Sequence, residues 1–250
     1  MGQNFLVDRE VAERIVGLLD DEPGRVLEIG PGRGALTGPL AERFGRVLAL
    51  EIDHRLAGDL AARPWHSAVE VVHADALHDP LEPLVKSEAP WQVAANLPYS
   101  VGSAILRRLL PRHDLFASLV VMLQREVANR VVAVPGSRNH GLMALERAAW
   151  ADASIAFEVS PRAFRPRPKV VSAVVVLRLH PSPTKPDELE AGLRLAAHTL
   201  TKPRKMLGNA VRPLCDRNAL IAADIDPDLR PGQLALEDWV RLATTLRSAG

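Results

Sequence analysis

Two short stretches of this chain place polar groups where an apolar strand should end. The first, "ANLPYS" at 95–100, closes an apolar run with an amide, a proline and an aromatic ring. Pro98 pushes Leu97 into an extended conformation and has no N–H of its own, so the Leu97 carbonyl could face outward as an unpaired acceptor. Together with the side-chain oxygen of Asn96, it could hold both hydrogens of an amino group, while Tyr99 offers a face for an aromatic base.

Such an arrangement would suit the amino group of adenine, which is a weak nucleophile because its lone pair is delocalised into the ring. Two acceptors on its hydrogens would aim the lone pair at an electrophile and stabilise the positive charge that develops. The Tyr99 hydroxyl has no role in this scheme. The alternative is a strand that ends in a proline turn with Tyr99 in the core, and the motif alone leaves both open.

The second stretch, "LEIGPGRGALT" at 27–37, is a glycine loop between an expected strand and an expected helix. Glycines at 30, 32 and 34 allow a tight turn and a close approach to a ligand. Their spacing is G-x-G-x-G and not the G-x-G-x-x-G of dinucleotide-binding proteins. Glu51 ends the next expected strand, 21 residues after Gly30, where a carboxylate can accept hydrogen bonds from both ribose hydroxyls. The pair favours an adenosine-type ligand over a plain strand-to-helix turn.

Asp75, in "HADAL", ends a third expected strand. Its carboxylate could accept a hydrogen bond from the exocyclic amine of an adenine ring, although Asp is also a good helix N-cap. Because ligands of such sheets bind at the carboxyl ends of the strands, Asp75 in series with Gly30 and Glu51 favours the ligand interpretation.

Alternating strands and helices must position these groups. The pattern predicts an α/β fold with a mostly parallel sheet covered on both faces, and an antiparallel pair of strands at its edge. A proline-rich linker at 181–186 then separates a helical region. The expected strands are 25–30, 46–52, 69–73, 91–95, 119–123, 155–159 and 171–179, and the expected helices include 11–19, 35–44, 188–200, 205–214 and 237–246.

Composition excludes several classes of protein. A single cysteine, Cys215, cannot form an internal disulfide and suits a reducing compartment. One cysteine and scattered histidines give no zinc-site spacing, so no metal is expected. The apolar runs are far too short to span a membrane, and acidic residues from Asp8 onward argue against a secretory signal. We therefore expect a cytoplasmic protein.

The formal net charge of +1 hides a strong asymmetry. Residues 160–213 contain eleven Lys and Arg but only three Asp and Glu. A basic segment of this kind indicates a polyanionic partner, although a solvated basic face would have the same composition.

Seven motifs together resemble the bacterial small-subunit ribosomal RNA adenine N6,N6-dimethyltransferases (the KsgA type), over essentially the whole chain. They are "GQNFLVD" (2–8), "LEIGPGRGALT" (27–37), "ALEID" (49–53), "ANLPYS" (95–100), "MLQREVANRVVA" (122–133), "FRPRPKVVSAVV" (164–175) and "KPRKMLGNAV" (202–211).

The resemblance implies a class I (Rossmann-like) methyltransferase fold with a seven-stranded sheet over residues 1–181, followed by a helical RNA-binding domain over 182–250. It implies S-adenosylmethionine as methyl donor, with S-adenosylhomocysteine as product. The implied substrate is a pair of adjacent adenosines near the 3′ end of 16S rRNA in the small ribosomal subunit, with a role in subunit maturation. We expect a monomer.

The resemblance also assigns residues to sites. The donor site falls on Asn4, Leu6, Gly30, Glu51, Asp75 and Asn96, with Gly32 of the glycine loop, and the target-adenine site on Asn96, Leu97, Pro98, Tyr99 and Phe164. Phe164 would clamp the base opposite Tyr99, and a ring among Arg and Pro is expected to be exposed. RNA contacts are expected from Arg162, Arg165, Arg167, Lys169, Lys202, Arg204 and Lys205. The chain departs from the family pattern at Asn139-His140-Gly141 and in lacking basic residues before Gly2.

Three alternatives remain open. A large-subunit rRNA methyltransferase of the macrolide-resistance type usually has Asn-Ile-Pro-Tyr, so Leu97 and "GQNFLVD" favour the small subunit. A DNA adenine methyltransferase tends to have Asp-Pro-Pro-Tyr and a separate domain that reads sequence. A ribosome assembly factor with the same fold would not need the complete set of site residues.

Overall fold

The computed structural model describes residues 4–65, 68–212 and 214–248. Gly2 and Gln3 of the "GQNFLVD" motif lie outside this range. The chain divides into two compact units: residues 1–128 with 151–180, and residues 129–150 with 181–250. We call the first the sheet unit and the second the helical unit.

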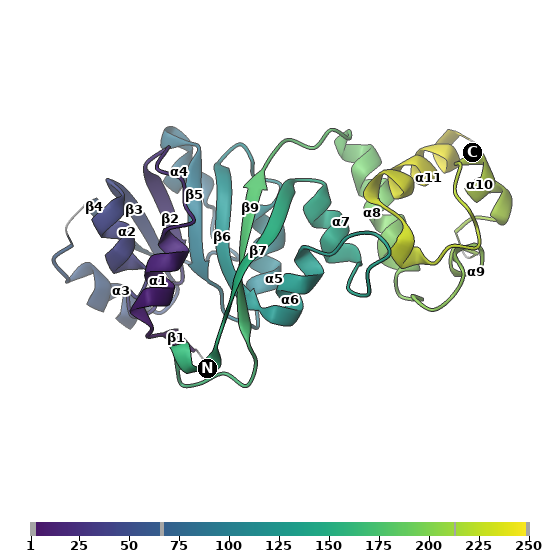
Figure 1. Ribbon diagram of the computed structural model, residues 1–250. Coiled ribbons are helices and arrows are strands. Elements are labelled where there is room, and N and C mark those ends of the chain that lie inside the picture. Colours follow the sequence, from purple (N-terminus) through teal and green to yellow (C-terminus); the bar gives the residue numbers. More distant parts are fainter. Residues whose placement is uncertain (1–3, 66–67, 213, 249–250) are drawn as a thin grey trace. The chain divides into compact units, whose positions relative to one another are not determined.

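The sheet unit is built on one seven-stranded sheet (Figure 1). Neighbouring strands from β4 to β6 pair in parallel, whereas β9 runs antiparallel to both of its neighbours. The mostly parallel sheet with an antiparallel edge is thus confirmed; β9 is the reversed strand and β7 is outermost. The spatial order is β4 (Ala68–His73), β3 (Arg46–Glu51), β2 (Arg25–Ile29), β5 (Trp91–Asn96), β6 (Phe116–Gln124), β9 (Ser172–Leu179) and β7 (Ala151–Val159).

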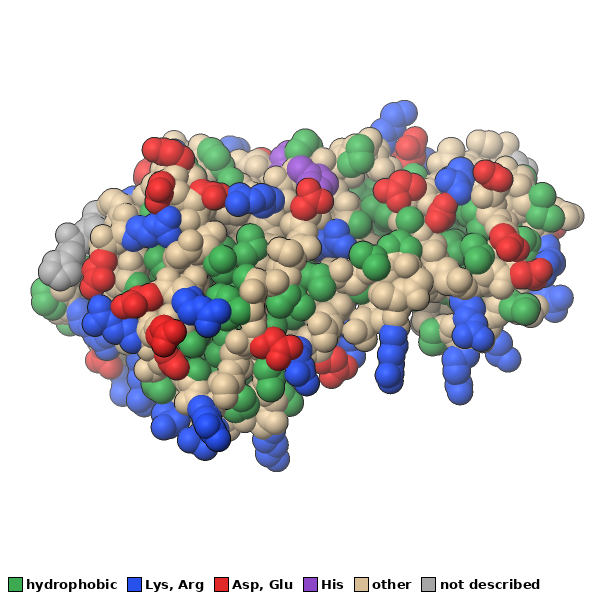
Figure 2. Space-filling view, in the orientation of Figure 1, with side chains coloured by type: hydrophobic (Ala, Val, Ile, Leu, Met, Phe, Trp, Pro, Cys, Tyr) green, Lys and Arg blue, Asp and Glu red, His purple; other side chains and the backbone are tan. Residues whose placement is uncertain are grey.

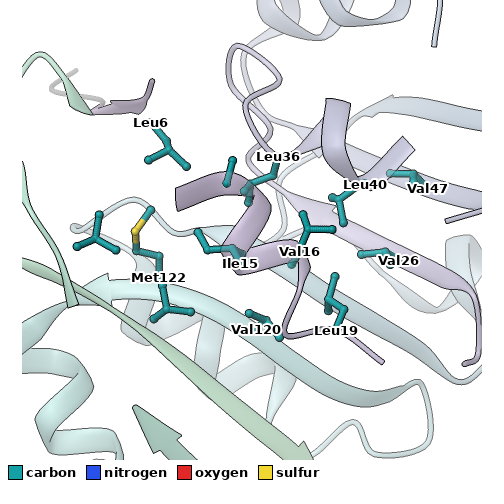
Figure 3. Packing of buried hydrophobic residues seen from close by; sticks show 14 of the residues in the cluster. Leu6, Ile15, Val16, Leu19, Val26, Leu36, Leu40, Val47, Val120 and Met122 are labelled. Carbon is teal, nitrogen blue, oxygen red and sulfur yellow. The ribbon is translucent and has the colours of Figure 1, made fainter. Parts of the chain in front are cut away.

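Helices cover both faces of this sheet. Val26 and Leu27, adjacent in β2, are both fully buried although they point to opposite faces. On one face, α1 (Arg9–Val16) and α2 (Thr37–Arg43) pack Ile15 and Leu40 over the strands (Figure 3). On the other face, Leu123 packs beside Gly102 at the start of α5. The remaining helices of this unit are α3 (His54–Ala61), α4 (Glu82–Val85), α5 (Gly102–Leu109), the short 3-10 helices Lys86–Glu88 and Pro161–Ala163, and α6 (Arg125–Val131), which continues into the helical unit.

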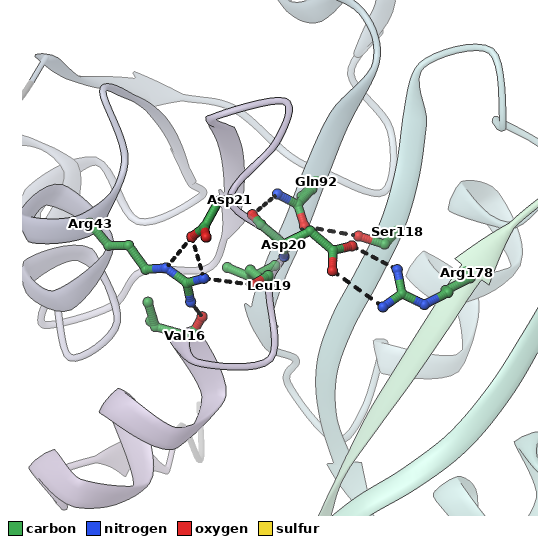
Figure 4. Close-up of polar contacts among 8 residues, drawn as sticks. All are labelled: Val16, Leu19, Asp20, Asp21, Arg43, Gln92, Ser118 and Arg178. Carbon is green, nitrogen blue, oxygen red and sulfur yellow. Dashed lines mark hydrogen bonds and ion pairs between the residues drawn. The ribbon is translucent and has the colours of Figure 1, made fainter.

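A polar cluster ties the first helix to the amino-terminal end of the sheet (Figure 4). The buried Gln92 side chain accepts from the Asp20 N–H at 2.8 Å and donates to the Asp20 carbonyl at 2.7 Å. Ser118 donates to the same Gln92 oxygen, and Asp20 pairs with Arg178 of β9 at 2.6 Å. The oxygen and nitrogen of the buried Gln92 amide both have hydrogen-bond partners, so Gln92 holds the segment after α1 against β5. This contact lies near the start of β5, at the opposite edge from the carboxyl ends of the strands.

A two-stranded sheet joins residues 5–6, near the start of the chain, to residues 164–165. The sequence patterns did not reveal this pairing. β1 (Phe5–Leu6) pairs antiparallel with β8 (Phe164–Arg165), so that Leu6 lies opposite Phe164. The Val7 N–H also donates to the Ala163 carbonyl at 2.8 Å. The pairing brings the N-terminal segment beside residues that follow it by about 160 positions in sequence.

The helical unit packs around Trp239 and Leu242, and the five α-helices described in this unit all contribute apolar residues to this core. Gly192 allows α8 and α11 to approach closely, since a side chain there would meet the Val240 backbone. The helices are α7 (Leu142–Ala148), α8 (Pro186–Thr199), α9 (Leu207–Ala210), α10 (Arg217–Ala222) and α11 (Leu236–Ser248), with a 3-10 turn at Pro231–Gln233.

Two details of the sequence-based organisation differ from the structure. Residues 129–150, which the prediction assigned to the first domain, pack with the C-terminal helices, because Leu145 and Ala149 belong to the helical core. The helix expected over 205–214 is a single turn, α9, since Met206 is extended and Gly208 and Asn209 are weak helix formers. The roles assigned to the two domains stay predictions.

None of the helices in the described part of the chain is long and apolar enough to cross a membrane.

Candidate active site

A cavity of about 460 Å³ opens at the carboxyl ends of β2, β3 and β5. It brings together most of the residues that the sequence assigned to a donor site and a target site, which come from four separate stretches of chain. The predicted residues on its wall are Asn4, Leu6, Gly30, Gly32, Glu51, Asn96, Leu97, Pro98 and Tyr99; Phe5, Glu28, Pro31, Arg33, Ala35, Leu36, Ile52, Ser100 and Val101 complete the lining.

The glycine loop and Glu51 form one structural unit. The Gly30 N–H donates to the Leu50 carbonyl at 2.9 Å, and the Gly32 N–H donates to Glu51 Oε2 at 2.9 Å. Glu51 Oε1 accepts from the Asp53 N–H at 3.0 Å, and the Glu51 residue is only 1% exposed. Each carboxylate oxygen therefore has one protein donor and retains a lone pair for a ligand hydroxyl.

Gly30 and Gly32 serve the loop in different ways. Both have positive φ, +68° and +58°, which L-residues rarely adopt. A Cβ at Gly30 would meet nothing within 4 Å, so the backbone there is open to a ligand. A Cβ at Gly32 would approach the Phe5 ring to 3.1 Å, so this glycine lets the N-terminal segment close over the loop.

Glu28 is a second buried carboxyl group on the cavity wall, and the sequence analysis did not single it out. It is 1% exposed and accepts a hydrogen bond from Thr37 Oγ1 at 2.6 Å. Burial, together with the nearby Glu51 carboxylate, raises the pKa of Glu28 to about 8, against the partial compensation of the Thr37 bond. A carboxyl group among the apolar residues of the strand "RVLEI" was the signal that could have identified it.

The end of β5 presents the two acceptors that the sequence predicted. Asn96 donates its amide nitrogen to the Asn4 carbonyl at 3.4 Å, which leaves its Oδ1 without a donor among the described residues. The Leu97 N–H donates to the Met122 carbonyl at 3.2 Å, whereas no described residue donates to the Leu97 carbonyl. Asn96 and Leu97 both line the same cavity.

Tyr99 lies on the cavity wall and is held there through its hydroxyl. The Tyr99 hydroxyl and Ser172 Oγ are 2.7 Å apart, and Ser172, the first residue of β9, is fully buried. A buried hydroxyl pair of this kind sets the position of the ring. The Tyr99 hydroxyl therefore anchors the ring to β9, and the expectation that it has no chemical role stays a prediction.

Asp75 does not lie on the cavity wall. Its Oδ1 accepts from the Leu77 N–H at 2.8 Å and its Oδ2 lies 2.7 Å from His78 Nδ1. The hydrogen bond from His78, followed by that from Leu77, lowers the pKa of Asp75. Asp75 thus caps the turn that follows β4, which was the structural alternative to ligand binding, and its role toward a donor stays a prediction.

Phe164 is fully buried and not on the cavity wall, so the expectation of an exposed ring is wrong. Pairing of β8 with β1 turns the ring into the cluster that contains Leu6 and Met122. An Arg- and Pro-rich sequence context did not reveal this, because the burial depends on a partner strand at the other end of the chain. Phe164 thus belongs to the same apolar cluster as Leu6, which lines the cavity.

The predicted RNA-binding residues share one property: none of them forms an ion pair with a carboxylate of the described residues. Of the eleven Lys and Arg of the basic segment, only Arg178, Lys185 and Arg194 have such partners. Arg162, Arg165, Arg167 and Lys169 are exposed in the sheet unit, and Lys202, Arg204 and Lys205 belong to the helical unit. Unpaired cations are those that remain available to phosphates.

Within the described ranges, no group of three or more His, Cys, Asp or Glu is arranged to hold a metal ion.

The fold and the cavity define a Rossmann-like methyltransferase, with the ligand cavity at the carboxyl ends of its parallel strands. The sequence model of the family described as "Ribosomal RNA adenine dimethylase" matches residues 1–248. The chain belongs to this family.

Relatives in several bacteria support the assignment. The chain is 42% identical to the ribosomal RNA small subunit methyltransferase A of Ruegeria pomeroyi, covering 98% of this chain and 91% of that protein. It is 40% identical to the protein of the same name from Magnetococcus marinus, with 98% and 90% covered.

Solved structures share the fold over nearly the whole chain. A dimethyladenosine transferase from Plasmodium falciparum has a TM-score of 0.78 at 22% identity, with 95% of each chain covered. The 23S rRNA methyltransferase ErmE has a TM-score of 0.70 at 27% identity, covering 98% of this chain and 100% of that one.

Glu51→Gln should weaken binding of S-adenosylmethionine, the donor that the sequence resemblance implies. The substitution removes the charge and one of two acceptors for backbone N–H groups, and a charge-assisted hydrogen bond contributes about 1.5–3 kcal/mol. We expect Kd to rise roughly 10-fold or more, measured by calorimetric titration. Glu70→Gln, which changes a carboxylate of β4 outside the cavity, is the matched control. An unchanged Kd for Glu51→Gln would remove this residue from the donor site.

Glu28→Gln should change how stability depends on pH. With a pKa of about 8 in the folded state against an ordinary 4.5, Glu28 keeps its proton when folded and loses it when unfolded between these pH values. The free energy of unfolding of the ligand-free protein should therefore fall as pH rises from about 5 to 8, by up to about 1.4 kcal/mol per pH unit from this group. Denaturant titrations of both proteins at pH 5 and pH 8 should show a flatter dependence in Glu28→Gln. Parallel curves would show that Glu28 ionises normally.

Proposed function

We propose that this protein transfers methyl groups from S-adenosylmethionine to the 6-amino groups of two adjacent adenosines near the 3′ end of 16S rRNA, in small ribosomal subunits during their maturation. One observation carries the proposal most: the Asn96 amide, the Leu97 carbonyl and the Tyr99 ring lie on the wall of the cavity that also contains the glycine loop and Glu51. A cytoplasmic monomer that needs no metal is consistent with the proposed reaction.

The cavity fits the donor in volume and in chemistry. Its 460 Å³ lies within the range of about 300–1,000 Å³ that small-molecule sites occupy. Glu51 would accept the ribose hydroxyls, while the open backbone at Gly30 would allow close approach. Glu28 would ionise beside a cation, because an opposite charge favours the charged form of a carboxyl group.

S-adenosylmethionine, when bound, supplies a methyl group already activated by the sulfonium charge, so the task of the protein is to position the nucleophile. The free Asn96 Oδ1 and Leu97 carbonyl accept the two amino hydrogens and stabilise the charge that develops on nitrogen. Tyr99 presents its ring to the base, and Ser172 fixes the angle of that ring. The displaced proton leaves to water.

Selection of the small subunit is supported by the relatives named for it, which are 37–42% identical to this chain over 97–100% of its length. A large-subunit substrate is the second candidate, because the 23S rRNA methyltransferase ErmE shares the fold at 27% identity. Incubation with under-methylated small subunits and, separately, with unmodified 23S rRNA, followed by mass spectrometry of adenosines, distinguishes the two. Dimethyladenosine in 23S rRNA alone would reverse the choice.

Asn96→Ala should slow methyl transfer by about 10²–10³-fold in single-turnover reactions at saturating donor, by analogy with loss of an oxyanion-hole donor. The lost acceptor acts most strongly as charge develops, so affinity for small subunits should change little. Donor affinity must be measured separately, since Asn96 also borders the donor side of the cavity. Asn218→Ala, on the exposed surface of α10, is the matched control. A wild-type rate in Asn96→Ala would exclude it from the chemical step.

Tyr99→Ala should impair capture of the adenosine, because a stacked base contributes about 1–3 kcal/mol.

Tyr99→Phe keeps the ring but leaves the buried Ser172 hydroxyl without a partner, which should destabilise the protein by about 1–3 kcal/mol. Adding Ser172→Ala should recover most of that loss. The experiment is a double-mutant cycle in which unfolding and single-turnover methylation are both measured. If Tyr99→Phe and Ser172→Ala acted additively, the hydroxyl pair would not position the ring.

A further inference from the structure

A second hollow lies entirely within the helical unit. It has a volume of about 550 Å³ and is bounded by the loop 136–142, the end of α8 with residues 201–203, and the turn 230–233. We propose that this cleft holds one unpaired nucleotide of the RNA substrate, with its phosphate on Arg138 and Arg230. The inference rests on the proposed function, since it requires an RNA substrate, and it adds a binding site remote in sequence from the methyl-transfer residues.

The charge of the cleft lining favours an anionic ligand. The lining contains Arg138 and Arg230 but no Asp or Glu, and both arginines are exposed and form no ion pair with a described carboxylate. Several other arginines of the helical unit are neutralised by carboxylates of the same unit: Arg217 pairs with Asp228 and Arg247 with Asp187. Two uncompensated guanidinium groups on separate walls of one cleft are suited to a phosphate, which they can bind in bidentate fashion.

The rest of the lining suits a base. Leu142, Leu200 and Pro203 supply apolar surface. Ser137 and Thr201 donate their hydroxyl hydrogens to the Val134 and His198 carbonyls at 2.7 Å, so their oxygens remain acceptors. A base edge presents both donors and acceptors, and such a mixed lining can receive it.

The cleft is held open by bonds between its walls. The Gly232 carbonyl accepts from the Gly136 N–H at 2.8 Å and lies 3.0 Å from His140 Nδ1. A carbonyl only accepts, so His140 carries its proton on Nδ1, and burial lowers the pKa of His140, which keeps the ring neutral near pH 7. His140, one of the positions that depart from the family pattern, thus joins the loop 136–142 to the turn 230–233. A preformed cleft loses less entropy when it binds.

The cleft continues into a basic strip on the same unit. Lys202, Arg204 and Lys205 adjoin Thr201 and Pro203 in sequence, and none pairs with a carboxylate in the described chain. Lys and Arg side chains project together from the helical unit in the space-filling view (Figure 2). A phosphate backbone leaving the cleft would therefore meet further cations, which favours RNA over a protein partner.

The test measures binding to under-methylated small subunits as a function of salt concentration. Each protein–phosphate contact contributes about 0.9 to the slope of log K against log salt concentration for a duplex and about 0.7 for a single strand. Because both arginines are proposed to bind one phosphate, the double variant Arg138→Ala/Arg230→Ala should reduce the slope by about 0.7–0.9 and weaken binding at low salt. Arg138→Lys/Arg230→Lys should keep most of the slope. The matched control, Arg194→Ala/Arg247→Ala, removes two exposed, paired arginines of the same unit and should leave the slope unchanged.

A photoreactive amino acid at Thr201 identifies the partner, with one at the exposed Thr244 of α11 as control. Crosslinks from position 201 to 16S rRNA support the proposal, whereas crosslinks to a ribosomal protein, or an alanine variant with the wild-type salt slope, overturn it. Failure of the proposed function would be seen separately, as absence of methylation by the wild-type protein. In that case an arginine-dependent salt slope for a single-stranded RNA oligonucleotide would still support the cleft as an RNA site, and a slope that does not depend on the two arginines would reject it.

Discussion

Burial of two carboxyl groups in one cavity is the constraint on which the site depends. An ionised carboxylate removed from water costs several kcal/mol unless donors compensate it. The fold meets this cost in two ways: the Gly32 and Asp53 N–H groups donate to the Glu51 carboxylate, whereas a pKa of about 8 lets Glu28 keep its proton at neutral pH while it accepts a hydrogen bond from Thr37. Two carboxyl groups thus lie on the wall of one cavity.

The glycine loop takes its shape from the Glu51 carboxylate. Glu51 lies at the end of β3 while the loop follows β2, and these strands pair in register from Arg25 with Arg46 to Ile29 with Leu50. Gly32 can therefore reach Glu51 only because the loop turns back at positive φ toward the neighbouring strand. Any shift in this pairing would separate the donor from the acceptor and leave a buried charge without its partner.

Much of the fold could be predicted because its signals are local. Each of the seven strands shows a short apolar run, and the residues at the carboxyl ends of three parallel strands meet as the α/β rule requires. Glu51, Asn96 and Tyr99 were found on this basis; they line one cavity, and their roles stay predictions.

The errors and omissions concern contacts between distant positions. Phe164 is buried by a two-residue strand formed with Leu6, and two residues carry no periodic signal. Ser172 meets Tyr99 across 73 positions, so neither sequence context reveals the bond. For Asp75 the sequence favoured ligand binding over a helix cap, whereas its hydrogen bonds to Leu77 and His78 place it in the turn after β4.

The two ligands of the proposed reaction carry opposite charges, and one protein must attract both. A cationic donor requires negative groups, which would repel RNA if they were exposed. Glu28 and Glu51 are each 1% exposed, so an RNA backbone would not contact their carboxyl groups, whereas the exposed, unpaired Lys and Arg lie at the surface that the proposed RNA substrate would approach. Protonation of Glu28 also removes one of the two negative charges until a cation is bound. The net charge of +1 is the difference between 31 Lys and Arg and 30 Asp and Glu over the whole chain, so it indicated neither ligand, whereas the uneven distribution of the charges fits both ligands of the proposed reaction.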